Sequence, residues 1–195
     1  MRILFIFTLI LSAFTLKVNA QKKGDDKPGK DFIINNSYDT IWGKISGNLT
    51  PATASLKLNF TDNNTGTKRV YKPYDLKSWH PSGFDYYFES REYRPKGHRA
   101  EEQGFGVFMK CFTPYEGDVR YYEYYNTDGQ EGYYQSFLVR RGVMLEVKFE
   151  KFYSQLAEYF ADNPELVEKL KAKKFKKTEL AKIVDEYNMG SNRKA

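Results

Sequence analysis

Hydrophobic and polar residues alternate along most of the chain between residues 31 and 149. A period of two residues is typical of a strand that buries one face. Segments with this period predict strands at 32–35, 40–46, 56–60, 68–72, 77–80, 84–88, 104–112, 119–125, 133–140 and 143–149. Turn sequences such as Asn63-Asn64-Thr65-Gly66 and Arg141-Gly142 separate neighbouring strands. Consecutive strands joined in this way favour an antiparallel meander.

The period changes to about 3.6 residues after Phe149, as in an amphipathic helix. The first helical stripe contains Phe149, Phe152, Tyr153, Leu156 and Phe160. Asn163 and Pro164 are typical first residues of a second helix. A third helix has its apolar residues at Leu180, Ile183, Val184 and Tyr187, and Gly190 is expected to end it. The sequence therefore predicts an α+β fold. An antiparallel β meander, either an open sheet or a barrel-like roll, is capped by about three carboxyl-terminal helices.

One predicted strand, 119–125, carries aromatic residues on both faces. Tyr121 and Tyr125 fall on one face, whereas Tyr122 and Tyr124 fall on the other. A single core cannot cover both faces. Either the carboxyl-terminal helices cover the second face or it forms an open aromatic surface. We expect the helices to cover it, because their own apolar stripes need a partner.

The amino terminus has the pattern of a secretory signal peptide. A basic Arg2 precedes an apolar run, and Val18-Asn19-Ala20 offers a cleavage site after residue 20. The run is shorter than a membrane-spanning helix requires, so no transmembrane segment is expected after cleavage. We therefore predict a signal peptide at 1–20, a flexible leader at 21–30, a β domain at 31–149, a helical cap at 150–189 and a tail at 190–195. The protein is expected to be exported to the periplasm, the outer membrane or the medium.

The charge of the chain is moderately basic, with 31 lysines and arginines against 25 acidic residues. No helix-turn-helix, zinc-finger or RNA-binding motif accompanies this charge, so a nucleic-acid partner is not expected. Aromatic residues make up 17% of the chain, which excludes a disordered protein. Cys111 is the only cysteine, so no internal disulfide can form. It shares a strand face with Val107 and Met109, which predicts a buried thiol.

Few residues suggest a catalytic or metal site. The two histidines, His80 and His98, lack the spacing of a zinc site, and neither a nucleotide-binding nor a nucleophile-elbow motif is present. Glu123 falls among tyrosines on its strand and needs a partner if it is buried, for which Arg140 is the expected residue. The sequence therefore predicts no catalytic residue, no metal and no cofactor. It favours a protein that is not an enzyme.

A run of lysines lies between the second and third predicted helices. It contains Lys169, Lys171, Lys173, Lys174, Lys176 and Lys177. Such a run usually forms a solvated face. The alternative is contact with an anionic surface, either lipid headgroups or acidic glycans, because several lysines together attract such a surface.

The two ends of the domain resemble a family of short, exported, uncharacterised bacterial proteins. The amino-terminal motif of this family is matched by Ile33, Asn36, Asp39-Thr40-Ile41 and Gly43-Lys44-Ile45, although Asp31 and Tyr38 replace its glycines. Its carboxyl-terminal motif is matched by Glu179-Leu180, Ile183-Val184 and Tyr187-Asn188. The resemblance implies a protein of the Gram-negative cell envelope and carries over no catalytic residue.

These observations favour a non-enzymatic binding or scaffolding domain of the cell envelope. Its partner would be an envelope protein or a glycan. The alternative is a carbohydrate-binding or carbohydrate-active protein, because exposed aromatic rings stack on the apolar faces of sugars. The candidate rings for that alternative are Trp42, Trp79, Tyr122 and Tyr124.

Overall fold

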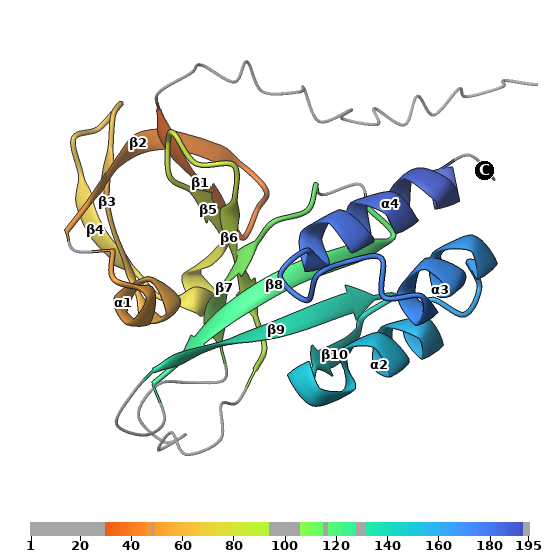
Figure 1. Cartoon of the computed structure of the whole chain (residues 1–195). Coiled ribbons are helices and arrows are strands. Elements are labelled where there is room, and N and C mark those ends of the chain that lie inside the picture. The colour runs from red at the N-terminus through yellow and green to blue at the C-terminus, as the bar shows by residue number, and fades with distance from the viewer. Residues whose placement is uncertain (1–29, 48, 94–105, 115–116, 128–131, 193–195) are drawn as a thin grey trace, which may run out of the picture.

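A single antiparallel sheet organises the molecule (Figure 1). The computed structural model describes residues 30–47, 49–93, 106–114, 117–127 and 132–192. In these residues the ten strands are β1 (Asp31–Asn35), β2 (Thr40–Ser46), β3 (Leu58–Asp62), β4 (Lys68–Tyr71), β5 (Leu76–His80), β6 (Tyr87–Arg91), β7 (Val107–Cys111), β8 (Val119–Asn126), β9 (Tyr133–Arg140) and β10 (Val143–Val147). The sheet is open, with β4 and β10 at its edges. The predicted α+β fold is confirmed, and the open form of the sheet is the correct alternative. The predicted signal peptide lies outside the described residues.

The order of the strands follows the chain except at one point. The order is β10-β9-β8-β7-β6-β5-β1-β2-β3-β4. β5 follows β4 in the chain, but it pairs with β1 and not with β4. Phe32 lies opposite both Trp42 in β2 and His80 in β5. The sheet therefore consists of two meanders that meet at β1. The segment β1 to β5 is strongly curled, as Figure 1 shows.

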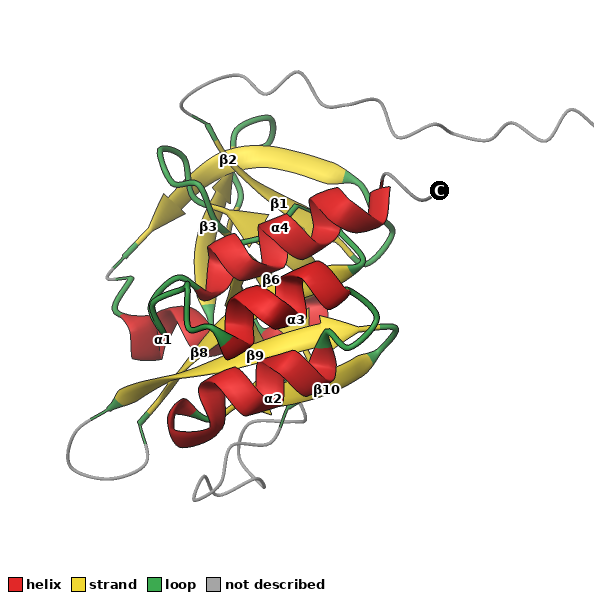
Figure 2. Ribbon diagram, turned by 45° about the vertical axis from the view of Figure 1, so that its right-hand side comes forward, coloured by secondary structure: helices red, strands yellow, loops and turns green. Residues whose placement is uncertain are grey.

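Three carboxyl-terminal helices cover one face of the sheet (Figure 2). They are α2 (Phe152–Tyr159), α3 (Pro164–Lys171) and α4 (Leu180–Asn192). A short helix, α1 (Pro51–Leu56), and two 3-10 turns, η1 (Pro73–Asp75) and η2 (Phe149–Lys151), complete the elements. Asn163 caps α3 as expected, because its side chain accepts a hydrogen bond from the Leu166 amide at 3.2 Å.

Several elements differ from the predictions. α1 had no predicted counterpart, although Thr50 caps it and Pro51 begins it. β6 begins at Tyr87, three residues later than expected. α4 continues past Gly190 to Asn192. A Cβ atom at Gly190 would lie 3.3 Å from the side-chain nitrogen Nδ2 of Asn163. The glycine therefore allows α4 to pack closely against the start of α3.

The two faces of β8 belong to different hydrophobic cores, as its tyrosines predicted. Tyr121 packs with Leu138 and with residues of all three carboxyl-terminal helices, including Leu156 and Leu170. Tyr122 and Tyr124 pack on the opposite face, with Met109, Cys111 and Phe137. A third core, around Ile33, Leu58, Phe60 and Trp79, fills the curled segment. The helices therefore cover the second aromatic face, and that prediction is confirmed.

Asn188 attaches α4 to the start of β8. Its side-chain oxygen accepts a hydrogen bond from the Val119 amide at 2.9 Å, and its side-chain nitrogen donates to the Val119 carbonyl at 2.8 Å. Both Asn188 and Val119 are buried. The asparagine thus satisfies two backbone groups that water cannot reach.

We expect Asn188→Ala to lower the free energy of unfolding by about 2 kcal/mol, because it leaves both Val119 backbone groups buried without this partner. Equilibrium denaturation with urea would measure the loss. Met189→Ala is the control, since Met189 is the next residue along α4 and is exposed. An unchanged stability of Asn188→Ala would contradict this role of the asparagine.

The edge of β10 is occupied by a side chain from α2. The Gln155 amide nitrogen donates to the Glu146 carbonyl at 2.8 Å, and its oxygen accepts from the Lys148 amide at 2.9 Å. β9 is the only strand paired with β10 in the described sheet. Gln155 therefore makes with β10 the pair of hydrogen bonds that another strand would make.

Candidate functional site

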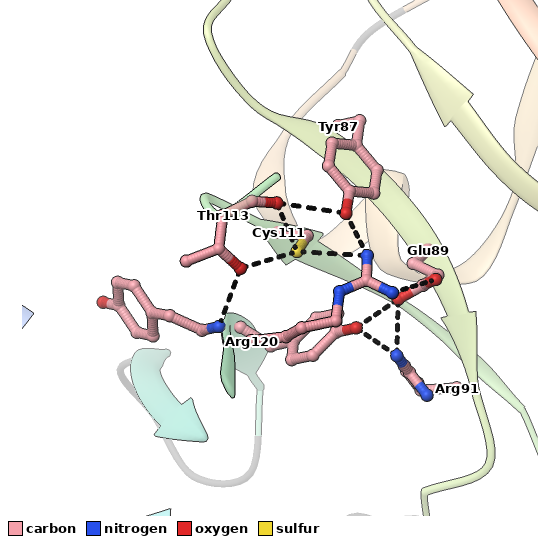
Figure 3. A network of polar contacts seen from close by, with 8 residues as sticks. Tyr87, Glu89, Arg91, Cys111, Thr113 and Arg120 are labelled. Carbon is pink, nitrogen blue, oxygen red and sulfur yellow. Dashed lines mark hydrogen bonds and ion pairs between the residues drawn. The ribbon is translucent and has the colours of Figure 1, made fainter. Parts of the chain in front are cut away.

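Charged and phenolic side chains form a network across β6, β7 and β8 (Figure 3). Tyr87, Glu89 and Arg91 alternate along β6 and so share one face. The sheet register places Tyr87 opposite Cys111, and Cys111 opposite Tyr122. Arg120 lies two residues before Tyr122 on the same face of β8. The strand pairing therefore brings these side chains together.

Glu89 is at the centre of the network. Its Oε1 is 3.0 Å from Nη1 of Arg120, and its Oε2 is 2.6 Å from Nη2 of Arg91. The Tyr122 hydroxyl also donates to Oε2 of Glu89. The side chains of Glu89 and Arg120 are each 15% exposed, and that of Arg91 is 26% exposed. Three donors thus hold one carboxylate that water barely reaches.

The electrostatics of the network favour fixed protonation states. Burial acts to lower the pKa of Arg120, but the Glu89 carboxylate together with Tyr122, Cys111 and Tyr87 outweighs it, and the pKa lies above its usual value. Burial raises the pKa of Tyr122. The arginine therefore stays charged and the phenol stays protonated at any physiological pH. Such groups are unsuited to proton transfer, and we interpret the network as structural.

Cys111 lies at the end of this network. Its Sγ is 3.6 Å from the Thr113 carbonyl oxygen and 3.7 Å from Nη2 of Arg120. The thiol is buried on the same face as Val107 and Met109, which confirms the predicted position. A buried cysteine is inaccessible to most reagents and substrates.

A cleft lies at one end of the helical cap, where β8, β9 and β10 meet the beginnings of α2 and α4. Its volume is about 490 Å³. We name it the tyrosine groove, and its lining residues include Tyr121, Glu123, Tyr133, Tyr134, Gln135, Ser136, Glu146, Lys148, Phe149 and Lys177. None of the charged residues of the buried network lines it. The groove thus offers an aromatic and polar surface that solvent reaches.

The wall of the tyrosine groove contains a hydrogen-bonded pair. The Tyr121 hydroxyl donates to Oε1 of Glu123 at 2.5 Å, and Ser136 Oγ is 3.5 Å away from the same hydroxyl. Burial, and then the nearby Glu123 carboxylate, raise the pKa of Tyr121, so the phenol remains a donor. The second oxygen of Glu123 has the chemistry to accept hydrogen bonds from a ligand.

Two consecutive tyrosines at the start of β9 are among the lining residues of the tyrosine groove. The register places Tyr134 opposite Tyr125, on the face of Glu123. Tyr133 lies opposite Asn126, on the other face, so only the Tyr134 ring shares a face with Glu123. Tyr133 is 50% exposed and Tyr134 is 52% exposed. The Tyr134 ring meets the Tyr125 ring edge-on, with 5.0 Å between their centroids. This contact orients the ring without covering it.

The predicted pair of Glu123 with Arg140 is wrong. The β8–β9 register places Ser136 opposite Glu123 and Val119 opposite Arg140, four residues apart along β8. Arg140 instead binds Asp118 at 3.0 Å and Asp162 at 2.6 Å. Its hydrogen bond lowers the pKa of Asp162. Glu123 is therefore left with the Tyr121 hydroxyl as its partner.

The four aromatic residues predicted to bind sugars do not form one surface. Trp79, Tyr122 and Tyr124 are buried in two different cores, and a buried ring cannot stack on a ligand. Trp42 is half-buried and its ring is 5.1 Å from that of Phe32. The groove instead presents the exposed ring of Tyr134, which sequence reasoning missed. Two consecutive tyrosines point to opposite faces of a strand, and this was the sequence signal that places one of them on the face of Glu123.

The six lysines of the predicted run have different surroundings. Lys169 lies between Glu165 and Glu186, with nitrogen–oxygen distances of 2.8 and 2.7 Å. Lys171 is 3.1 Å from Glu168. The remaining four lie in the segment between α3 and α4: Lys173, Lys174, Lys176 and Lys177. Only this second group is still a candidate for contact with an anionic surface.

His80 is the last residue of β5 and stacks on Phe32, with 5.1 Å between the rings and an angle of 17°. It is thus a packing residue. His98 lies outside the described residues. Within the described ranges, no group of three or more histidine, cysteine, aspartate or glutamate side chains is placed to bind a metal ion.

No protein-family model, curated protein or solved structure matches this chain. The family resemblance of its two ends therefore stays a prediction. Among the described residues, no helix has the length and apolar character needed to cross a membrane.

Proposed function

We propose that this chain is an exported, non-enzymatic binding domain of the cell envelope. Its ligand site is the tyrosine groove, and its ligand is a neutral saccharide. The exposed Tyr134 ring, on the same face of the sheet as the hydrogen-bonded Glu123 carboxylate, supports this assignment. The signal-peptide pattern of residues 1–20 supports export.

The chemistry of the tyrosine groove suits a sugar. Saccharides have apolar C–H faces that stack on exposed aromatic rings such as that of Tyr134. Their hydroxyl groups donate to carboxylates, and Glu123 supplies such a group. The volume of about 490 Å³ is within the usual range of ligand sites.

Isothermal titration with neutral oligosaccharides would test this function. Suitable probes are cellohexaose, maltohexaose and triacetylchitotriose. We expect one of them to bind, and we expect Tyr134→Ala to weaken that binding about tenfold, because the ring loses its stacking contact.

Tyr74→Ala is the matched control. Tyr74 is 60% exposed but lies in η1, in the curled segment of the sheet. This variant should bind the same probe as tightly as the parent chain does. If no neutral saccharide binds, or if Tyr74→Ala weakens binding as much as Tyr134→Ala, the proposed function is wrong.

A further inference from the structure

A lysine-rich segment lies against an exposed phenylalanine at the edge of the tyrosine groove. Phe149 begins η2 and is 70% exposed, the highest value for a large hydrophobic side chain in the described residues. Lys148 precedes it in the sequence, and Glu150 and Lys151 follow it. We name this surface the lysine–phenylalanine patch. It comprises Phe149 with Lys148, Lys151, Lys173, Lys174, Lys176 and Lys177.

Specific contacts bring the two segments of the patch together. Lys177 donates from Nζ to the Phe149 carbonyl at 2.6 Å, and the same Nζ is 3.8 Å from the centre of the Phe149 ring. Next to them, the Tyr153 hydroxyl donates to the Phe175 carbonyl at 2.8 Å. Lys173 Nζ is 5.9 Å from the Tyr153 ring. The segment between α3 and α4 is therefore packed against the start of α2.

The two segments that form the patch are rich in lysine. Residues 148–153 and 171–179 contain seven lysines and two glutamates, whereas the net charge of the whole chain is only +6. One of the seven, Lys171, is paired with Glu168. The side chains of Lys173, Lys174 and Lys176 are exposed. These two segments thus carry a net charge of +5.

An apolar ring among lysines fits the boundary between water and lipid. Aromatic side chains insert at the headgroup level, while lysines bind anionic headgroups and are attracted over about 10 Å. A soluble polyanion would satisfy the lysines but would leave Phe149 in water. The combination of charge and exposed ring favours a lipid surface.

We infer that the lysine–phenylalanine patch docks the protein on an anionic lipid surface, with Phe149 inserted among the headgroups. The interaction is peripheral and reversible, since one ring and a few lysines bury little apolar area. It goes beyond the proposed saccharide site: the patch shares Lys148, Phe149 and Lys177 with the lining of the tyrosine groove, but Tyr134 and Glu123 take no part in it.

Sedimentation with vesicles would test the inference. The protein recovered in soluble form after expression of the full chain is mixed with vesicles of phosphatidylcholine alone or of phosphatidylcholine with phosphatidylglycerol. We expect binding to the anionic vesicles only, and a loss of binding as salt is raised. Any contribution of residues 1–30 is the same in every variant, so the comparison of variants isolates the patch.

The triple variant Lys173→Gln, Lys174→Gln, Lys176→Gln should weaken vesicle binding roughly a hundredfold, at about fivefold for each lysine. Its matched control is Lys44→Gln, Lys57→Gln, Lys68→Gln, which removes the same charge from exposed positions elsewhere. Phe149→Ala should weaken binding about tenfold, whereas Phe84→Ala, at another exposed phenylalanine, should not.

Equal binding to both kinds of vesicle, or equal losses in the triple variant and its control, would overturn the inference. Binding to polygalacturonate without binding to anionic vesicles would also overturn it, and would assign the patch to acidic glycans. Tyr134→Ala should leave vesicle binding unchanged, so failure here is distinguishable from failure of the saccharide site.

Discussion

Glu89→Ala is expected to lower the free energy of unfolding by about 3–5 kcal/mol. The substitution removes the carboxylate that pairs with both Arg91 and Arg120. The two guanidinium groups then remain largely buried next to each other and lose their shared counter-ion. Breaking a buried ion pair from one side costs more than the pair itself contributes, because the remaining charge is no longer compensated. Urea denaturation followed by circular dichroism would measure the change.

Glu92→Ala is the matched control for this experiment. Glu92 is the same residue type, follows β6 directly and is exposed. Its substitution should change the free energy of unfolding by less than about 0.5 kcal/mol. Similar losses in the two variants would show that the network does not stabilise the protein in the way described.

Gly43→Ala is the second substitution for which we expect a large effect, a loss of about 3 kcal/mol in the free energy of unfolding. A Cβ atom at this position in β2 would lie 2.2 Å from Cζ of Phe60 and 2.2 Å from the carbonyl oxygen of Thr61. Phe60 is buried and has little room to move. Displacing the Thr61 carbonyl would separate β2 from β3, whose pairing runs through these residues. Thermal unfolding would detect the loss as a lower Tm.

Ser46→Ala tests whether any added or removed atom in β2 has this effect. Ser46 is exposed at the end of the same strand and lies opposite Asn59. We expect its Tm to stay close to that of the parent chain. A Gly43→Ala protein as stable as the parent would mean that β2 and β3 are farther apart than described.

The periodic parts of the fold could be predicted from the sequence. The alternation of residues in β8 is enough to predict which side chains lie on each of its two faces. Asn163 and Pro164 are enough to predict where α3 begins. By contrast, α1 is only six residues long, so its helical period hardly repeats. The pairing of β5 with β1 depends on contacts between residues far apart in the chain. A periodic pattern contains no information on such contacts.

The candidate site was harder to predict than the fold. Alternation assigns a residue to a face of a strand, but it does not say what covers that face. Tyr122 and Tyr124 are aromatic and buried, whereas Tyr133 and Tyr134 are aromatic and exposed. The partner of Glu123 depended on the register between β8 and β9, which is set by their whole length. Faces were therefore predictable, whereas neighbours across strands were not.

The contact of Gln155 with β10 has a consequence for how this protein meets other copies of itself. An unpaired strand edge is a template on which a second chain can add its own strand and continue the sheet into an aggregate. At the opposite edge, β4 presents Lys68 and Arg69, whose charges repel an identical edge. At β10 an incoming strand would meet a Glu146 carbonyl and a Lys148 amide that already have a partner. Growth of the sheet from this end would first have to displace Gln155 from the helical cap.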